Sequence, residues 1–290
     1  MISNNRQGNK YHDEKGRFCR ATDNKIGYLN DEATKSSGYA KNEKLQGRSW
    51  EELQEYERND FLEVNFTTPV TMKLFKKKII ENTNISDIWE PADYNGALDM
   101  DGVDVVGETE YGRQYAIDFK CLAMKLGKDI DVVNAEHNLV LFKFDKHKGR
   151  ETTGWLFKHN MTDFVGFTAI NTPYTREQLF KMEDRSKLRN VNGASLTYVN
   201  KYSLRNYIET NFKSESDLRS IYDSYKEKLY REHRTSEVVH LKGKDGVVLD
   251  MVISKDKYNG TNGYVATLYI NNETMRNKCG AKQFVMNKKK

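Results

Sequence analysis

Apolar residues alternate with polar ones in several short stretches of the chain, and this period of two predicts β-strands. The clearest stretch is GVDVVGETEYGRQYAIDFKCL, residues 102–122, in which two apolar runs flank a turn that contains glycine. The last 50 residues also consist of short apolar runs separated by Gly and Asn, which favours strands there. Residues 123–137 fit a helix and a loop equally well. We expect strands near residues 102–108, 113–122, 138–144, 153–158 and 163–170.

Helical spacing occurs in other parts of the chain. Ser49 and Glu52 form a capping box ahead of an apolar stripe, and Thr175 and Gln178 form a second one. Between them, Thr68 can cap a helix in which one face carries Met72, Phe75 and Ile79. Further helices are expected at about residues 176–189, 203–212 and 216–233.

The order of these elements predicts an α/β protein of the α+β type, with a mixed central β-sheet flanked by helices. Residues 1–46 are polar and lack periodicity, so we expect a flexible N-terminal arm. Residues 86–101 are acidic and irregular in pattern, and we expect them to lead into the first strand without regular structure. The remaining segments are then a core at 47–174, a helical region at 175–235 and a small β-rich C-terminal unit at 236–290.

Charged side chains interrupt the two strands of residues 102–122, where a buried sheet needs apolar ones. Side chains alternate between the faces of a strand, so Asp118 and Lys120 share one face. The segment ETEYGRQ fits a three-residue hairpin loop that ends at Gly112 in the left-handed conformation. A loop of this length, centred on Tyr111, places Asp104 directly opposite Asp118.

Two carboxylates whose Cβ atoms lie about 4.5–5.5 Å apart repel each other. They need a cation between them, or one of them must stay protonated. Mg²⁺ binds oxygen ligands and typically uses one or two carboxylates together with water and phosphate. We therefore expect Mg²⁺, or Mn²⁺ in its place, at Asp104 and Asp118, with the Phe119 backbone carbonyl as a third oxygen and Lys120 alongside. The competing interpretation is a surface hairpin in which the Asp and Lys side chains only pair with each other.

Composition narrows the classes of function. No apolar run approaches the roughly 20 residues of a membrane span, and the N-terminal MISNNRQGNK lacks the apolar stretch of a secretory signal. We therefore expect a cytoplasmic protein without a membrane partner. The spacing of Cys19, Cys121 and Cys279 fits neither a disulfide framework nor structural zinc. The formal net charge of +5 weakly favours a partner that carries phosphate groups.

The hairpin sequence resembles the PD-(D/E)XK nuclease superfamily, with Asp104 on one strand and the triplet Asp118, Phe119 and Lys120 on the next. Val103 stands where that signature often has proline. GWLF at 154–157 and TDFVGF at 162–167 also look like later strands of such nucleases, so the resemblance covers about residues 50–172.

The resemblance implies a restriction-endonuclease-like core, Mg²⁺-dependent hydrolysis of phosphodiester bonds, and Asp104, Asp118 and Lys120 as the catalytic residues. Asp104 and Asp118 would hold the metal, and Lys120 would position the attacking water. Many members add an acidic residue from an upstream helix. The sequence does not choose among five eligible residues: Glu52, Glu55, Glu57, Glu63 and Glu81.

Other charged residues have competing interpretations. Asp93, Asp99 and Asp101 are alternatives to Asp104, but the last two precede the apolar strand and are disfavoured. We expect a capped turn at Glu136 and His137. His159 and Asp163 are expected to be structural rather than catalytic. The basic residues of 203–233 fit a surface that tracks phosphates, but a solvated basic face explains them better.

We therefore expect a Mg²⁺-dependent endonuclease whose nucleic-acid substrate is DNA. YHDEKGRF at 11–18 resembles a stretch found in bacteriophage-encoded proteins, which points to a phage or another mobile element as the source. The sequence also permits a second copy of the chain or a host protein as a binding partner. The rival hypothesis is a non-catalytic phage protein with a nuclease-like core that binds and inhibits a host defence complex. A virion-associated structural protein is a third alternative.

Overall fold

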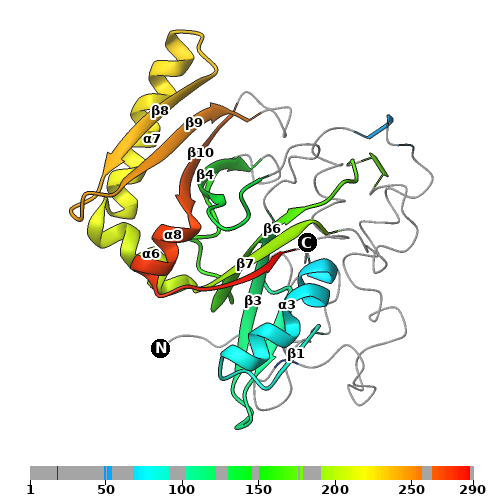
Figure 1. Ribbon diagram of the computed structural model, residues 1–290. Coiled ribbons are helices and arrows are strands. Elements are labelled where there is room, and N and C mark those ends of the chain that lie inside the picture. Colours follow the sequence, from blue (N-terminus) through cyan, green and yellow to red (C-terminus); the bar gives the residue numbers. More distant parts are fainter. Residues whose placement is uncertain are drawn as a thin grey trace, which may run out of the picture.

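The computed structural model describes residues 18, 49, 51–53, 68–91, 102–121, 130–145, 150–175, 177–178, 191–256 and 263–287. These residues form two β-sheets flanked by helices (Figure 1). The predicted α+β class with a mixed central sheet is confirmed. No helix among the described residues is both long and apolar enough to cross a lipid bilayer.

The first sheet has six strands in the described chain, in the order β1-β2-β3-β6-β7-β11. Strands β3 and β6 are parallel neighbours, whereas β2 pairs with β3, and β6 with β7, in antiparallel fashion. The strand bounds are β1 Asp87–Trp89, β2 Val105–Glu108, β3 Gln114–Cys121, β6 Phe164–Asn171, β7 Gly193–Asn200 and β11 Lys282–Asn287. β3 is therefore a central strand, flanked on both sides.

Helix α3, Thr68–Asn82, packs against this sheet (Figure 1). It begins at Thr68, as predicted, and Phe75 and Ile79 are fully buried. These two side chains share a hydrophobic cluster with Ile117 and Phe119 of β3. Burial of an aromatic or aliphatic side chain of this size contributes about 1.5–3 kcal/mol. The face of β3 that carries Ile117 and Phe119 is thus the core face toward α3.

The second sheet has five strands in the described residues, in the order β5-β4-β10-β9-β8. Their bounds are β4 Glu136–Asp145, β5 Arg150–Thr153, β8 Ser236–Lys242, β9 Val248–Lys255 and β10 Tyr264–Asn271. Strand β10 pairs with β4, and β11 pairs with β7. The strands that follow residue 236 therefore pair with earlier strands in both sheets, since β10 joins β4 and β11 joins β7.

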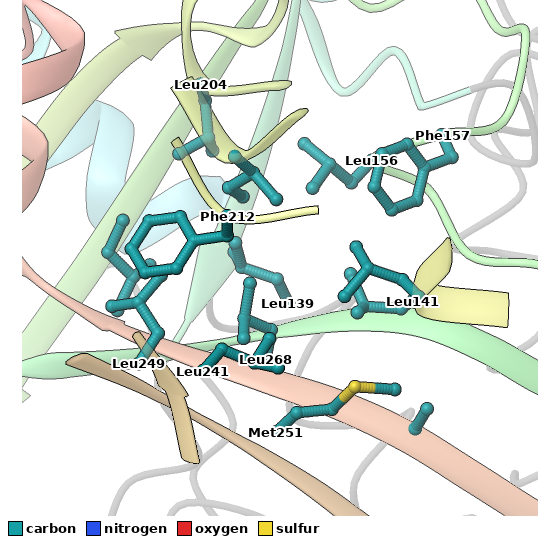
Figure 2. Packing of buried hydrophobic residues seen from close by; sticks show 14 of the residues in the cluster. Leu139, Leu141, Leu156, Phe157, Leu204, Phe212, Leu241, Leu249, Met251 and Leu268 are labelled. Carbon is teal, nitrogen blue, oxygen red and sulfur yellow. The ribbon is translucent and has the colours of Figure 1, made fainter. Parts of the chain in front are cut away.

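Helices α6, Lys201–Asn211, and α7, Glu215–Arg231, pack on this second sheet. Leu218, Tyr222 and Leu229 of α7 belong to the same buried cluster as Leu139 and Met251 of the sheet. Figure 2 shows Leu204 and Phe212, from α6 and its end, together with side chains of β4, β8, β9 and β10. The cluster also includes Val165 and Phe167 of β6, so it joins the second sheet to the first.

Local sequence signals predicted several elements correctly. Ser49 and Glu52 bond reciprocally, as do Thr175 and Gln178, so both capping boxes are confirmed. The helices expected at 203–212 and 216–233 are confirmed, and in the structure they span Lys201–Asn211 and Glu215–Arg231, so each end differs by one or two residues. Most of the predicted arm at 1–46 and most of the helix at 176–189 lie outside the described residues.

The expected strand at 153–158 is wrong. Strand β5 ends at Thr153, and residues 155–157 form a turn in which Lys158 N–H donates to Gly154 O at 2.9 Å. Gly154 N–H donates to Leu141 O at 2.6 Å. A Cβ atom on Gly154 would overlap the Val140 carbonyl oxygen, so the chain approaches β4 more closely than any other residue allows. Residues 154–157 are thus apolar because they fold back into the core.

Three further elements were missed. β1 lies in the stretch expected to be irregular, and β7 lies in the region expected to be helical. The residues of β7 from Gly193 to Val199 are all buried, so this strand lacks the alternation by which a half-buried strand is recognised. Helix α8, Asn272–Cys279, is short and polar and ends at Gly280, whose φ is +66°. The capped turn expected at Glu136 and His137 is also wrong, because both residues lie in β4.

A buried amide connects the two sheets. Asn272, the first residue of α8, is fully buried, and its Oδ1 lies 2.8 Å from His137 Nε2 of β4 and accepts from Thr197 Oγ1 of β7 at 2.6 Å. Its Nδ2 donates to the carbonyl oxygens of Val132 and Val133 at 3.3 and 3.2 Å. Each polar atom of this amide has a partner, as a buried polar group requires. The network fixes the position of the second sheet relative to the first.

This network predicts that stability depends on pH. Burial lowers the pKa of His137 to about 4, against the opposing effect of its hydrogen bond with Asn272. An unfolded histidine titrates near pH 6.5, so between pH 6.5 and 4 the unfolded state binds the proton that the folded state rejects. The free energy of unfolding should therefore fall by up to roughly 3 kcal/mol as the pH decreases through this range.

Urea unfolding measured between pH 7 and 4.5 checks this expectation. His137→Gln keeps a donor for Asn272 but does not titrate, so it should lose the part of the pH dependence that comes from His137. An identical pH dependence in the two proteins would contradict the assignment of the proton to this histidine.

Candidate metal centre at the charged hairpin

The hairpin between β2 and β3 has the predicted register. Val105 lies opposite Ile117, and Glu108 lies opposite Gln114. The loop is closed by the bond from Thr109 N–H to Arg113 O at 2.9 Å, and Gly112 has a φ of +74°. The three-residue loop centred on Tyr111 is therefore confirmed. The paired residues end at Val105, and extension of the same register by one residue would set Asp104 opposite Asp118.

Asp118 is buried in the middle of β3, with 2% of its surface exposed. Its Oδ1 lies 2.9 Å from Lys120 Nζ, so the two side chains lie on the same face of the strand, as predicted. The Lys120 side chain is 29% exposed, which places this ion pair at the border between the core and solvent. The Asp118 Oδ2 atom is buried without a hydrogen-bond partner among the described residues. Such an atom is unusual, because buried carboxylate oxygens are normally satisfied.

Asp104 is half-buried just before β2 begins. Its backbone N–H donates to Ile117 O at 2.9 Å, and its Oδ2 accepts from Phe119 N–H at 2.6 Å. The Asp104 carboxylate therefore accepts the hydrogen bond of a β3 amide beyond the last backbone pair of β2 and β3. The N–H and C=O groups of one strand residue point to the same side, so the Phe119 carbonyl also faces the Asp104 edge of β3. Asp104, Asp118 and this carbonyl thus lie at one end of the hairpin.

A segment that precedes β6 closes the other side of Asp118. Thr162 Oγ1 donates to Gly102 O at 2.8 Å and ties this segment to the residues before β2. Gly102 has a φ of +76°, and a Cβ atom there would overlap Thr162 Oγ1. The same Cβ atom would lie 3.0 Å from Asn160 Nδ2 and 3.3 Å from Asp118 Oδ2. The missing side chain of Gly102 therefore leaves room for two polar atoms, Thr162 Oγ1 and Asn160 Nδ2, to approach Asp118 Oδ2.

Sequence reasoning missed one residue of this cluster. Lys201, the first residue of α6, is buried, and its Nζ donates to Lys158 O at 2.9 Å and to Asn160 Oδ1. Burial lowers the pKa of Lys201 to about 8, and the nearby Asp118 carboxylate opposes this shift. A lysine two residues after the run SLTYV was the available signal, but it is informative only once this run is recognised as the buried strand β7.

The donor atoms fit a small hard cation of the kind that uses few protein ligands. The described residues contain no group of three or more His, Cys, Asp or Glu side chains that could hold a metal ion. Asp118 supplies a buried oxygen that no described residue hydrogen-bonds, Asp104 supplies a second carboxylate, and Phe119 supplies a carbonyl on the same edge. Mg²⁺ in proteins is commonly held by one or two carboxylates, with water and phosphate oxygens completing the shell. The set therefore matches Mg²⁺ better than zinc or calcium.

The other predicted acidic residues lie elsewhere or outside the described chain. Glu52 is exposed and bonds Ser49, and Glu81 lies 3.5 Å from Lys77 on α3. Asp163 Oδ2 accepts from Ala116 N–H at 2.8 Å, and His159 is exposed. The following candidates lie outside the described residues: Glu55, Glu57, Glu63, Asp93, Asp99 and Asp101.

Most of the basic residues on α6 and α7 are engaged in ion pairs. Arg205 lies 3.1 Å from Glu209, and Lys226 lies 2.7 Å from Glu151. Arg219 stacks over the Phe142 ring, with its Cζ atom 3.9 Å from the ring centroid. These contacts favour the interpretation of a structural and solvated basic face over a surface that tracks a phosphate backbone.

Comparison of the chain with models of known protein families, with curated proteins and with solved structures finds no match. The resemblance to the PD-(D/E)XK superfamily therefore stays a prediction carried by Asp104, Asp118 and Lys120. The geometry adds two facts to it, namely the hairpin register and the unpartnered Asp118 oxygen.

The packing around Gly102 generates a prediction with a matched control. Gly102 and Gly246 both have a positive φ, at +76° and +83°, but a Cβ atom on Gly246 would meet nothing within 4 Å. Gly246→Ala should therefore cost only the left-handed strain, about 1–2 kcal/mol. Gly102→Ala should cost a further 1–3 kcal/mol or so, because the new methyl group overpacks the site.

Urea unfolding of the two variants beside the unsubstituted protein measures both costs. Equal losses of stability would show that Gly102 is not enclosed by Thr162, Asn160 and Asp118.

Proposed function

We propose that this protein is a Mg²⁺-dependent phosphodiesterase that cleaves nucleic acid, with DNA as the expected substrate. Its active site would lie at the β2–β3 hairpin of the protein. The observation that carries the proposal is the buried Asp118 Oδ2 atom, which has no hydrogen-bond partner in the part of the chain that the structure describes. The hairpin register supports it, because its extension by one residue would set Asp104 opposite Asp118. The ion pair of Asp118 with Lys120 at 2.9 Å supplies the third expected group.

The energetics of Asp118 favour a site over a structural pair. A buried ion pair is often no more stabilising than apolar side chains of the same size, because both charges lose their hydration. β3 is a central strand whose opposite face carries Ile117 and Phe119 in the core. An apolar residue at position 118 would suit such a strand at least as well. The retention of a carboxylate with one open oxygen is explained if that oxygen binds a ligand.

Each side chain has a role that follows from its position. Asp118 and Asp104 would hold a divalent ion between the hairpin end and the Gly102 segment, with the Phe119 carbonyl as a further donor. A divalent ion at this position supplies Lewis-acid polarisation of a phosphate and lowers the pKa of a water molecule. Lys120 reaches from the buried carboxylate to solvent, so its ammonium group can orient a water molecule or offset negative charge on the phosphate.

A cleavage assay tests the proposal. Purified protein is incubated with plasmid, linear and single-stranded DNA and with RNA, in Mg²⁺, in Mn²⁺ and in EDTA. We expect cleavage with either metal and none in EDTA. Asp118→Asn and Lys120→Met should each lower the rate by roughly 10²–10³-fold, because each removes a charge from the centre where the reaction occurs.

Asp250→Asn is the matched control, because Asp250 on β9 is partly exposed and pairs with His240 of the neighbouring strand β8. It should cleave at the rate of the unsubstituted protein, and circular dichroism should show all three variants folded. The proposal fails if the unsubstituted protein cleaves none of the four substrates, or if Asp118→Asn cleaves as fast as the control. In the first case, the alternative of a non-catalytic protein that binds a host complex gains weight.

A further inference from the structure

Lys201 is held in place from two directions. Its backbone N–H donates to Asp163 O at 2.9 Å, and Asp163 Oδ2 in turn accepts from Ala116 N–H of β3. Its side chain, 8% exposed, donates to Lys158 O and to Asn160 Oδ1. The residue therefore connects the start of α6, the segment from Lys158 to Asp163 and the strand that carries Asp118.

The contact with Asn160 determines what that amide can do. Because Asn160 Oδ1 accepts from the Lys201 ammonium, its Nδ2 is directed away from Lys201. Nδ2 is then one of the three atoms that converge on Gly102, beside Thr162 Oγ1 and Asp118 Oδ2. Without Lys201, the shape of the amide would not fix this orientation, because its two ends are nearly equal in shape.

The charge of Lys201 also requires an explanation. A buried ammonium is costly unless a negative group lies nearby, and both of its hydrogen-bond partners are neutral oxygens. Asp118 is the negative group that favours its protonated form. Lys120 occupies Asp118 Oδ1, while Asp118 Oδ2 has no hydrogen-bond partner among the described residues. Lys201 therefore interacts with the carboxylate electrostatically from the Asn160 side of the site, without a direct ion pair with Asp118.

We propose that Lys201 is a positioning residue of the candidate metal centre. It holds the Lys158–Thr162 segment over Gly102 through Asn160, and it keeps a positive charge beside Asp118 while Oδ2 stays open. The consequence for catalysis rests on the proposed function, whereas the tether and the charge balance do not.

Hydrogen exchange tests the tether. In Lys201→Met, which removes both hydrogen bonds but keeps an apolar side chain, amides of residues 158–163 should exchange about tenfold faster or more. Amides of α7 should exchange as before. Lys244→Met is the matched control, because Lys244 Nζ also donates to a backbone oxygen, Thr210 O, at 2.7 Å but on the surface. Unchanged exchange at 158–163 in Lys201→Met would overturn the proposal.

A double-mutant cycle tests the charge balance without any assay of activity. Asp118→Asn should destabilise the protein less in the Lys201→Met background than alone, because the buried ammonium that loses its counter-charge is then absent. The same cycle with Lys244→Met should be additive. Additive losses for Lys201 and Asp118 would overturn the charge balance. If Lys201→Met does not fold, Lys201→Gln, which keeps a donor for Asn160 without the charge, replaces it in the cycle.

Measurement of kcat and KM tests whether Lys201 affects catalysis at the candidate metal centre. Lys201→Met should lower kcat by about tenfold or more, with a smaller change in KM, because misplacement of the site affects the chemical step more than binding. A kcat equal to that of Lys244→Met would overturn the positioning role. If the unsubstituted protein cleaves no substrate, the proposed function fails, and the exchange and stability measurements still decide the role of Lys201 in the structure.

Discussion

The burial of the Asp118 carboxylate is the constraint on which the surrounding structure depends. An ionised group in a protein interior costs several kcal/mol unless charges and hydrogen bonds compensate it. Here Lys120 pairs with one oxygen, and Lys201 contributes a second positive charge nearby. The other oxygen has no hydrogen-bond partner among the residues that the structure describes. The compensation is therefore electrostatic and incomplete, which is the condition expected of a carboxylate that binds a further ligand.

The two sheets contribute differently to this arrangement. The first sheet supplies β3 and the hairpin that brings Asp104 to it. The second sheet supports the chain between β5 and β6: Gly154 lies against β4, and Leu156 and Phe157 enter the main cluster. This support places the segment that contains Asn160 and Thr162 over Asp118. The Asn272 network then fixes β4 relative to β7, after which Lys201 follows directly. The position of the candidate centre thus depends on both sheets.

Features that depend on residues close together in the sequence were predictable from it. The hairpin register follows from side-chain alternation and one turn glycine, and both capping boxes and α3 follow from local hydrogen-bonding patterns. Asn160 and Lys201 were not predictable in this way, because the pairing of β3 with β6 and of β6 with β7 brings them to Asp118. The buried strand β7 lacks alternation, and the apolar turn at 155–157 imitates a strand, so sequence patterns placed neither correctly. Nucleic acid as a partner stays a prediction, since no contact among the described residues tests it.

The central claim is that Asp104 and Asp118 hold a divalent ion, and the position of bound Mn²⁺ tests it most directly. Crystals soaked in Mn²⁺ give an anomalous signal that locates the ion independently of any assay of activity. The account predicts one strong peak bonded to Asp118 Oδ2 and to Asp104, which disappears in Asp118→Asn crystals. A map without a peak at the hairpin, in crystals in which both carboxylates are well ordered, would contradict it.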